Sequence, residues 1–387
     1  SEILPASPNY YLVPLESKVE DEYAEGWKIT EAMPVNVLGF QSHRDEFAID
    51  TDLQALRRRI QQMRDPEFSD SDFKQKYGLK DAAGWEVAKA RLRLRDLDDW
   101  ETAISRVAYR PFDDRWGYFT GIVMDRPRRE LIEHVARKEN LCLVVARQAL
   151  NGDFKHVLAT KAPAEGNLLQ SAKGGNSFPL WLYPTDAPAE LLDTAPREKR
   201  ANLAPEFVTA LTETIGTTPS PEDTLAYIYA VLYAPSYRAR YADFLKRDFP
   251  RVPLTTNRPL FDALVGIGRE LIALHVMDTV LPRVTSFDVP GDNTVDKVRW
   301  APDAEGAMGR VYINAEQFFG KVPAAVWDMH IGGYRVAEKW LKDRKGRPLT
   351  YDDLTHYQAV IAALARTLQL QAAIDAAIDG AGGWPLT

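Results

Sequence analysis

Two kinds of segment divide this sequence, and their order constrains the fold more than any other feature. Short runs rich in β-branched and aromatic residues fill much of the first half, whereas apolar residues at helical spacing dominate the second half. A stretch rich in Pro, Ala and charged residues, 186–204, separates the halves and predicts a linker or domain edge. This order predicts an α+β protein, in which a mixed-sheet N-terminal domain with flanking helices precedes a mainly helical C-terminal domain.

Helices are expected beside the N-terminal sheet. Leu53, Leu56 and Ile60 lie on one apolar face of a predicted helix, and either Asp50 or Thr51 can cap it. Further helices are predicted over 85–94 and 128–138, and strands joined by a polar turn at 41–45 are predicted over 32–50. The other predicted strands are 104–109, 116–122, 141–146, 154–159 and 178–182.

The second half is predicted to form long helices and a small β-hairpin. The helices are expected at 205–215, at 221–249 with a break near 234–235, at 259–277 and at 351–378, and the hairpin pairs 295–300 with 310–313. We therefore expect an N-terminal segment (1–50), an α/β recognition subdomain (51–185), a linker (186–204) and a helical subdomain (205–387).

Composition restricts the class of protein. The chain has 387 residues, of which 45% are apolar and 27% charged, so it is long enough for two or three packed domains. Its longest apolar runs are shorter than the roughly 20 residues of a membrane helix, and Ser1 begins no secretion signal. The lone Cys142 sits in an apolar run typical of a buried strand. We expect a cytoplasmic protein with no membrane partner, and the missing initiator Met suggests a fragment.

Charge is unevenly distributed. The net charge of −7 argues against a protein that is basic all over. Between 335 and 347, however, six basic residues face two acidic ones, a local net of +4, and between 237 and 251 five face two, a net of +3. These clusters could form a DNA-binding face, although solvated helix surfaces show the same pattern.

Known catalytic patterns are absent from the sequence. It has no phosphate-binding GxxxxGK[ST] loop, and its one G-x-G string, Gly266-Ile-Gly268, lies in a helical pattern after no strand. Ser7-Pro-Asn-Tyr10 has Asn9 where the base-gripping loop of amino-methyltransferases has its second proline. The six histidines show no metal-ligand spacing, and adjacent acidic pairs fit helix caps or turns. We predict no catalytic residue, no metal site and no bound cofactor.

Several strings occur together in an order that resembles a known family. They are 7–14 (SPNYYLVP), 39–45 (GFQSHRD), 109–115 (YRPFDDR), 140–148 (NLCLVVARQ), 177–184 (SFPLWLYP), 227–241 (YIYAVLYAPSYRARY) and 331–347 (IGGYRVAEKWLKDRKGR). Together they resemble the C-terminal target-recognition region of Type ISP restriction-modification enzymes and, more distantly, that of Type IIG adenine methyltransferases. The resemblance implies recognition of double-stranded DNA. It also implies upstream nuclease, helicase and methyltransferase domains, with S-adenosylmethionine bound in the last.

Basic and amide side chains in these strings and in the basic clusters are the candidate DNA contacts. Arg and Lys bind phosphates, and Arg, Gln and Asn pair with guanine or adenine edges. The candidates are Arg44, Arg110, Arg115, Arg126, Arg128, Arg147, Gln148, Lys173, Asn176, Lys246, Arg247, Arg251, Arg335, Lys339, Lys342, Arg344, Lys345 and Arg347.

Other interpretations of these residues remain open. Arg110 and Arg115 either pair with Asp113 and Asp114 or reach phosphate, and Arg147 either reads bases or pairs with an interior carboxylate. Gly174 with Gly175 either admits a ligand or closes a hairpin turn. The whole chain could also be a scaffold that docks to a methyltransferase or partner subunit without binding DNA.

Overall fold

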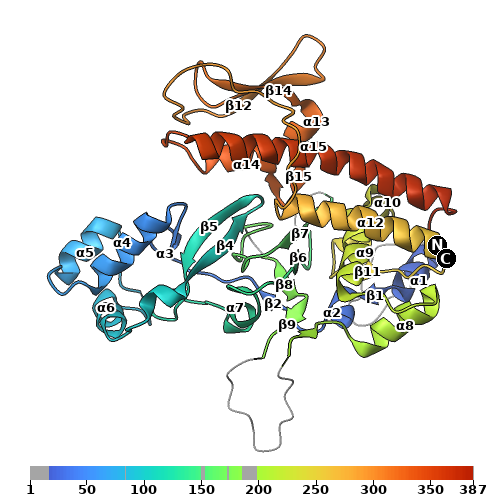
Figure 1. The fold of residues 1–387 in the computed structure, drawn as a ribbon, viewed down its shortest axis with the longest axis horizontal. Coiled ribbons are helices and arrows are strands. Elements are labelled where there is room, and N and C mark those ends of the chain that lie inside the picture. The colour runs from blue at the N-terminus through green and yellow to red at the C-terminus, as the bar shows by residue number, and fades with distance from the viewer. Residues whose placement is uncertain (1–16, 83, 150–152, 172–173, 185–197, 387) are drawn as a thin grey trace, which may run out of the picture.

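The structure is a computed structural model that describes residues 17–82, 84–149, 153–171, 174–184 and 198–386. Helices and small antiparallel sheets alternate along it, which confirms the predicted α+β class. Figure 1 shows a lobe at one end, a central sheet, a group of helices at the other end and a separate small sheet above the long C-terminal helix. The strings at 7–14 and most of the predicted linker lie outside the described residues.

The N-terminal lobe surrounds a three-stranded sheet in the order β3–β5–β4. Its elements are α3 (Asp45–Ala48), β3 (Ile49–Asp50), α4 (Leu53–Arg64), α5 (Asp70–Tyr77), α6 (Val87–Arg95), a 3-10 helix (Trp100–Ala103), β4 (Ile104–Arg110) and β5 (Asp113–Tyr118). Their buried side chains, among them Phe47, Ile60 and Phe73, form a cluster of their own.

In this lobe one local prediction was wrong and one helix was missed. The cap of α4 is Asp52, whose carboxylate accepts a 2.7 Å hydrogen bond from the Gln54 amide. Asp50 instead forms an ion pair with Arg59, nine residues away. The sequence pattern of a helix cap gives no sign of such a partner. Helix α5 was not predicted, because Phe73 is its one residue described as buried and the apolar period is short.

The central sheet has the order β2–β8–β6–β7, with every pair antiparallel. Its strands are β2 (Val37–Leu38), β6 (Cys142–Val145), β7 (Val157–Thr160) and β8 (Asn176–Pro179), and α7 (Arg129–Val135) packs beside β8. All four residues of β6 are fully buried, which explains their uninterrupted apolar run. The short strands β9 (Trp181–Leu182) and β10 (Arg200–Ala201) pair next to it.

Helix α9 (Pro221–Tyr233) is the centre of the helical region, because every residue from Thr224 to Tyr233 is buried. It packs on α12 (Arg258–His275) and α15 (Tyr351–Gly380). The surrounding elements are α1 (Ser17–Glu25), β1 (Trp27–Lys28), α2 (Ile29–Ala32), α8 (Pro205–Ile215), α10 (Pro235–Arg240), α11 (Ala242–Leu245) and β11 (Arg251–Val252). The core of this region is continuous with that of the central sheet. The predicted domain boundaries remain a prediction.

Among the described residues, α15 is the one helix long and apolar enough to cross a membrane by length and composition. Tyr357, Ile361 and Leu364 of this helix are buried, and it packs against other helices of the chain. Its apolar character is therefore explained by the core that it helps to form.

The predicted hairpin near 295–313 is part of a three-stranded sheet, β12 (Arg299–Pro302), β13 (Met308–Tyr312) and β14 (Phe318–Pro323). Strand β14 was not predicted. Beyond it, α13 (Ala324–Trp327), the two-stranded turn β15 (His330–Ile331) and β16 (Tyr334–Arg335), and α14 (Val336–Lys342) lead to α15. Gly332 has φ +60, and a Cβ there would lie 1.9 Å from the Leu169 carbonyl, so this turn packs directly on the loop after β7.

Candidate nucleic-acid interface

Polar side chains from several separate segments lie at or near the ends of strands of the central sheet. We call this set the strand-end surface: Asn36, Gln41, Arg126, Arg147, Gln148 and Asn176. Asn176 begins β8 and pairs with Leu38 on one side and with Val145 on the other. Arg147 and Gln148 follow β6 after Ala146, so β2, β6 and β8, together with the Gln41–Arg126 bridge, position these residues.

One half of the strand-end surface is built on β2 and its continuation. The Asn176 side-chain amide donates a 2.7 Å hydrogen bond to the side-chain oxygen of Asn36. Gln41 and Arg126 exchange two backbone hydrogen bonds of 2.9 and 3.0 Å. The Arg126 guanidinium also donates to the Gln41 side chain at 3.3 Å. The Gln41 amide thus lies beside an exposed guanidinium, and the Asn36 amide lies beside that of Asn176.

A close backbone approach brings the loop before β8 to this half. Gly174 has φ +64, and a Cβ there would lie 2.8 Å from the carbonyl oxygen of Gly166. A Cβ on Gly166 would in turn lie 3.1 Å from the Gln41 side chain. The space beside Gly174 is therefore filled by the chain itself, which agrees with the turn interpretation. Lys173, another candidate, lies outside the described residues.

The other half of the surface contacts the segment after α11. Arg147 forms a 2.8 Å ion pair with Asp248, which also pairs with Lys28. Burial would raise the pKa of the Asp248 carboxyl, but Lys28 and Arg147 outweigh it and hold the pKa below its ordinary value. Gln148 donates a 2.6 Å hydrogen bond to the Arg247 carbonyl. Arg147 remains 64% exposed, so its carboxylate partner lies at the surface and not in the interior.

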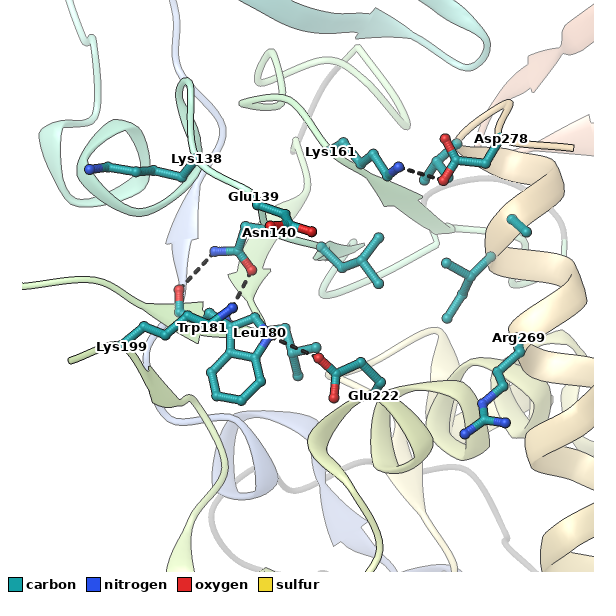
Figure 2. A pocket seen from close by; sticks show the side chains of 14 residues that line it. Lys138, Glu139, Asn140, Lys161, Leu180, Trp181, Lys199, Glu222, Arg269 and Asp278 are labelled. Atoms are coloured by element: carbon teal, nitrogen blue, oxygen red, sulfur yellow. Dashed lines mark hydrogen bonds and ion pairs between the residues drawn. The ribbon is translucent and has the colours of Figure 1, made fainter.

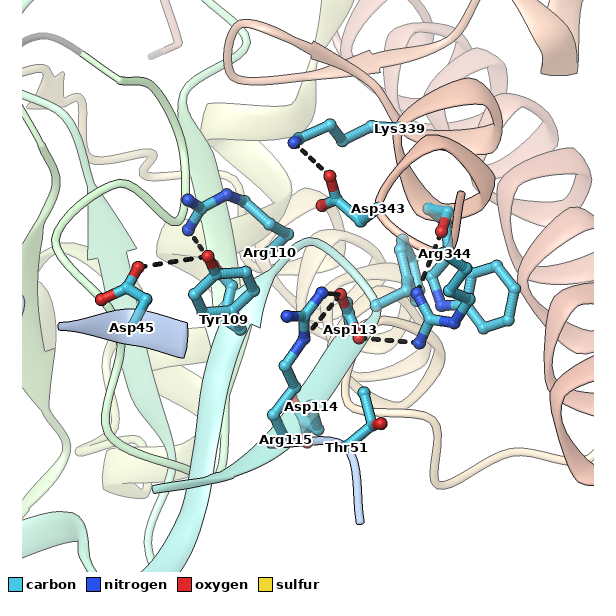
Figure 3. A network of polar contacts seen from close by, with 12 residues as sticks. Asp45, Thr51, Tyr109, Arg110, Asp113, Asp114, Arg115, Lys339, Asp343 and Arg344 are labelled. Carbon is cyan, nitrogen blue, oxygen red and sulfur yellow. Dashed lines mark hydrogen bonds and ion pairs between the residues drawn. The ribbon is translucent and has the colours of Figure 1, made fainter. Parts of the chain in front are cut away.

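A second group of candidates forms a buried ionic network between the N-terminal lobe and the C-terminal region. Figure 3 shows Asp113 between Arg115 and Arg344, at 2.7 and 2.8 Å. Burial raises the pKa of Asp113, but the two guanidinium groups outweigh it and lower the pKa to about 2. Arg110 pairs with buried Glu165 at 2.5 Å. The structure thus favours the pairing interpretation for both arginines, but only Arg115 has one of the expected partners, Asp113, whereas Arg110 pairs with Glu165 instead of Asp113 or Asp114.

The basic residues on and after α14 differ among themselves. Lys342 pairs with Glu338 and Lys339 with Asp343, both one helical turn away, and Arg335 pairs with Asp328. These pairs are partly exposed, and such surface pairs are worth about 0–1 kcal/mol. Arg347 contacts Asp353 and Thr51, Lys345 is exposed, and Arg344 is buried as described above. The local net of +4 is thus largely balanced by neighbouring carboxylates.

The remaining candidates lie apart from one another. Arg44 packs its guanidinium 3.8 Å from the centre of the Trp85 ring and pairs with Asp125. Arg251 donates to the carbonyls of Ala24 and Gly26. Lys246 lies 3.4 Å from Asp243 at the surface, and Arg128 is half-buried with φ +56 before α7. These contacts give Arg44 and Arg251 structural partners, while Lys246 stays largely open to solvent.

Two residues of the strand-end surface were not among the candidates chosen from the sequence, Asn36 and Gln41. The sequence offered one signal for them: both carry side-chain amides, and they lie within the predicted strands at 32–50 and their polar turn at 41–45. Their pairing with Asn176 and Arg126 joins segments 140 and 85 residues apart, which local patterns do not reveal.

A pocket of about 410 Å³ lies elsewhere, between the end of β9 and helices α9 and α12 (Figure 2). The indole of Trp181 donates a 3.1 Å hydrogen bond to Glu222, and Lys161 pairs with Asp278 at its rim. None of the candidate DNA contacts lines it. Within the described residues, no group of three His, Cys, Asp or Glu side chains is placed to hold a metal ion.

Solved structures share this fold. The chain is similar to "ATP-dependent Type ISP restriction-modification enzyme LlaBIII bound to DNA" (TM-score 0.71, 18% identity), with 96% of this chain and 25% of that one covered. It is also similar to "cryoEM structure DrdV-DNA complex" (0.73, 20%, covering 96% and 40%). A third is a nuclease-deletion mutant of the Type ISP enzyme LlaGI in complex with a DNA substrate mimic (0.68, 19%, covering 96% and 35%). The chain thus spans well under half of each of these proteins.

No curated protein matches the chain. The family model of the Type ISP C-terminal specificity domain matches residues 31–372, which include the strand-end surface and the buried ionic network. This confirms the resemblance drawn from the sequence strings. The chain belongs to the Type ISP C-terminal specificity domain family.

Proposed function

We propose that this chain recognises a specific double-stranded DNA sequence for a restriction-modification N6-adenine methyltransferase. In this proposal it positions the target adenine for a methyltransferase domain outside the chain. The observation that carries the proposal is the strand-end surface, where strand β8 offers the Asn176 amide and the bridged segments of Gln41 and Arg126 offer an amide and a guanidinium group. The solved structures that share the fold include enzymes bound to DNA, which supports the same conclusion.

The chemistry of the strand-end surface suits base recognition. Gln and Asn pair with the N6 and N7 edge of adenine through two hydrogen bonds, and Arg pairs with O6 and N7 of guanine. The hydrogen bonds between Asn176 and Asn36 and between Arg126 and Gln41 hold these groups ready, so less conformational entropy is lost on binding. Such pairs are worth about 1–3 kcal/mol each in discrimination against a wrong base.

Phosphate contacts are assigned to basic residues that are exposed or only weakly paired. Arg147, Lys246, Lys342 and Lys345 are largely exposed. A phosphate can replace the carboxylate partners of Arg147, Lys246 and Lys342 at low cost, because exposed ion pairs contribute little. Arg344, Arg110 and Arg115 are unsuited to this exchange, since removing their partners would leave buried charges unpaired.

The adjoining functions belong to other parts of the parent enzyme in this proposal. S-adenosylmethionine would bind in the methyltransferase domain, and nuclease and helicase domains would lie upstream of it. We propose that this chain itself carries no catalytic centre and acts in the cytoplasm.

Selection from a random duplex pool tests the proposal directly. The purified chain is mixed with the pool at several salt concentrations, and the retained DNA is sequenced. We expect one asymmetric motif to be enriched, with log affinity falling against log salt by about 0.9 for each phosphate contact. Sequence recognition would be contradicted if the chain retained DNA without any enriched motif, and if the chain joined to its methyltransferase domain did the same.

A scaffold that binds no DNA is the second candidate function. It is favoured by the net charge of −7 and by the carboxylate partners that balance most of the basic cluster at 335–347. Lys342→Glu with Lys345→Glu separates the two functions. Recognition predicts much weaker DNA binding and intact folding, whereas a scaffold predicts no change because it binds no DNA before or after the substitution.

A further inference from the structure

The small sheet β12–β13–β14 presents a basic and aromatic face, and none of the DNA contacts assigned above lies on it. We propose that this face, made of Arg299, Arg310, Tyr312, Phe318 and Lys321, binds the phosphate backbone of duplex DNA outside the recognised bases. The inference rests on the proposed function, because it adds a second contact with the same DNA.

Strand register places these side chains on one side of the sheet. Arg299 pairs with Tyr312, and Tyr312 pairs with Phe318 on the next strand, so the three share a face. Arg310 lies two residues from Tyr312 and therefore points the same way. The opposite face carries Val311, which is fully buried. The sheet is thus amphipathic, with its basic and aromatic side turned away from the core.

The aromatic rings hold the arginines in defined positions. The guanidinium carbon of Arg299 lies 3.5 Å from the centre of the Tyr312 ring, and that of Arg310 lies 4.7 Å from the centre of Phe318. A guanidinium stacked on a ring presents its N–H groups at its edge. Some of these groups of Arg310 and Arg299 also hydrogen-bond the Tyr312 hydroxyl, which lowers the pKa of Tyr312. The N–H groups at these edges match the two oxygens of a phosphate. Because the rings already hold the arginine side chains, these side chains lose little conformational entropy on binding. The stacked arrangement therefore favours an oxyanion as the ligand.

Lys321 completes the basic face through a β-bulge. The pairing of β13 with β14 shifts register between Gly309 and Val311, and Lys321 opposite this shift has φ +59. A bulge of this kind redirects a side chain, and Lys321 is exposed. Lys321, Arg310 and Tyr312 together line a groove of about 510 Å³, in which Asp303 is the acidic lining residue.

Charge distinguishes this face from the other basic clusters of the chain. Arg299, Arg310 and Lys321 are the charged residues of the three strands, and in the described parts of the chain none of them forms an ion pair with a carboxylate. The acidic residues of this region lie in the connecting turns, as Asp303 and Glu316 do. Figure 1 shows the sheet projecting beyond α15, away from the rest of the molecule. A row of unneutralised cations on a projecting sheet fits the uniform negative charge of a duplex backbone.

A triple substitution tests the contact. Arg299→Gln, Arg310→Gln and Lys321→Gln are combined in one protein, and binding to a labelled duplex carrying the selected site is measured over a salt series. The matched control, Arg58→Gln, Lys80→Gln and Arg93→Gln, removes the same charge from exposed positions of the N-terminal lobe. We expect the slope of log affinity against log salt to become shallower by about 2.7 for the sheet variant, and binding at low salt to weaken more than about tenfold.

Sequence preference provides the second measurement. Because backbone contacts carry no base information, the sheet variant should lose the same factor on the selected site and on a scrambled duplex. If the wild-type chain binds DNA but the sheet variant keeps its affinity and slope, or loses no more than the control, the face does not bind DNA. If the wild-type chain binds no duplex, either alone or joined to its methyltransferase domain, the proposed function fails and this inference fails with it.

Discussion

Arg344 donates a 2.8 Å hydrogen bond to the carboxylate of Asp113, although 231 positions separate the two residues. Asp113 begins β5 in the N-terminal lobe, and Arg344 follows α14 near the start of the long C-terminal helix. Both side chains are buried, and the Arg344 guanidinium also stacks 3.4 Å from the centre of the Trp340 ring. This pair therefore fixes the lobe against the C-terminal region and keeps Arg344 from serving as a DNA contact.

Asp113→Asn should destabilise the protein strongly. The substitution removes the close carboxylate partner of buried Arg344 and partly buried Arg115, and it leaves Arg344 only the Asp353 carboxylate at 3.6 Å. Breaking a buried ion pair by removing one partner costs about 3–5 kcal/mol. We expect the midpoint of urea unfolding, followed by circular dichroism, to fall accordingly.

The exposed pair of Glu338 and Lys342 provides the control for this experiment. Glu338→Gln removes a carboxylate at a similar distance from its cation, 2.7 Å, but at the surface. Its cost should stay below about 1 kcal/mol. If the two substitutions lowered the free energy of unfolding equally, burial would not explain the difference expected between these ion pairs.

A second prediction concerns Gly266-Ile-Gly268, a string that could suggest nucleotide binding. A Cβ on Gly268 would lie 2.0 Å from the Ala226 carbonyl, so this glycine allows α12 to cross α9 in contact with its backbone. Gly268→Ala should force the helices apart and lower the free energy of unfolding by roughly 1–3 kcal/mol. Thermal unfolding measures the change.

Gly266→Ala is the matched comparison, because a Cβ at Gly266 meets nothing within 4 Å. Alanine in an exposed helix is favoured over glycine by up to about 1 kcal/mol, so this variant should be as stable as the wild type or more stable. Destabilisation of both variants to the same degree would contradict the proposed role of Gly268 in packing.

Elements with strong local patterns were predictable from the sequence. Helix α8 has the bounds expected from its proline start and apolar period, and α12 and α15 lie within two residues of theirs. Strand β14 was missed because Gly320 and Lys321 interrupt its alternation at the bulge. The local sequence pattern therefore predicts an element well where the residues of that element alone determine its structure.

The candidate site was less predictable, because its side chains take partners from distant segments. Arg344 and Lys345 are adjacent basic residues, yet one is buried on Asp113 and the other is exposed. Residue type and spacing cannot show which of the two is buried. Burial depends on which residue of the turn after α14 faces the N-terminal lobe. The sequence likewise does not single out Gln41, because only its backbone pairing with Arg126 brings it beside a cation.

A third prediction concerns pH. Burial, with a smaller contribution from Arg238, lowers the pKa of His275 to about 3. Its ring accepts or donates hydrogen bonds with Tyr229 at 2.6 Å and with Thr367 at 3.0 Å. An unfolded histidine has a pKa near 6.5. Between about pH 6.5 and 3 the unfolded chain therefore binds a proton that the folded chain excludes, and stability is lost as pH falls through this window.

His275→Phe should remove this contribution. The substitution keeps an aromatic ring, the Tyr229 oxygen still accepts from the Ala159 amide, and Thr367 still donates to Ala363. We expect the free energy of unfolding of the variant to fall less steeply with acidification, by at most about 1.4 kcal/mol per pH unit. Urea midpoints measured across the window test this. Parallel curves for the two proteins would show that His275 is protonated in the folded state.

The last prediction separates base recognition from phosphate binding. Gln41→Ala removes a side chain placed next to Arg126 on the strand-end surface and should reduce discrimination at one or two base pairs by about 1–3 kcal/mol. Lys342→Gln, at an exposed position of α14, should instead weaken binding to all duplexes alike and reduce the salt slope by about 0.9. Affinities for the selected site, its single-base variants and a scrambled duplex distinguish the two effects. If Gln41→Ala weakens binding to every duplex equally, the strand-end surface contacts the backbone, and the bases must be read elsewhere.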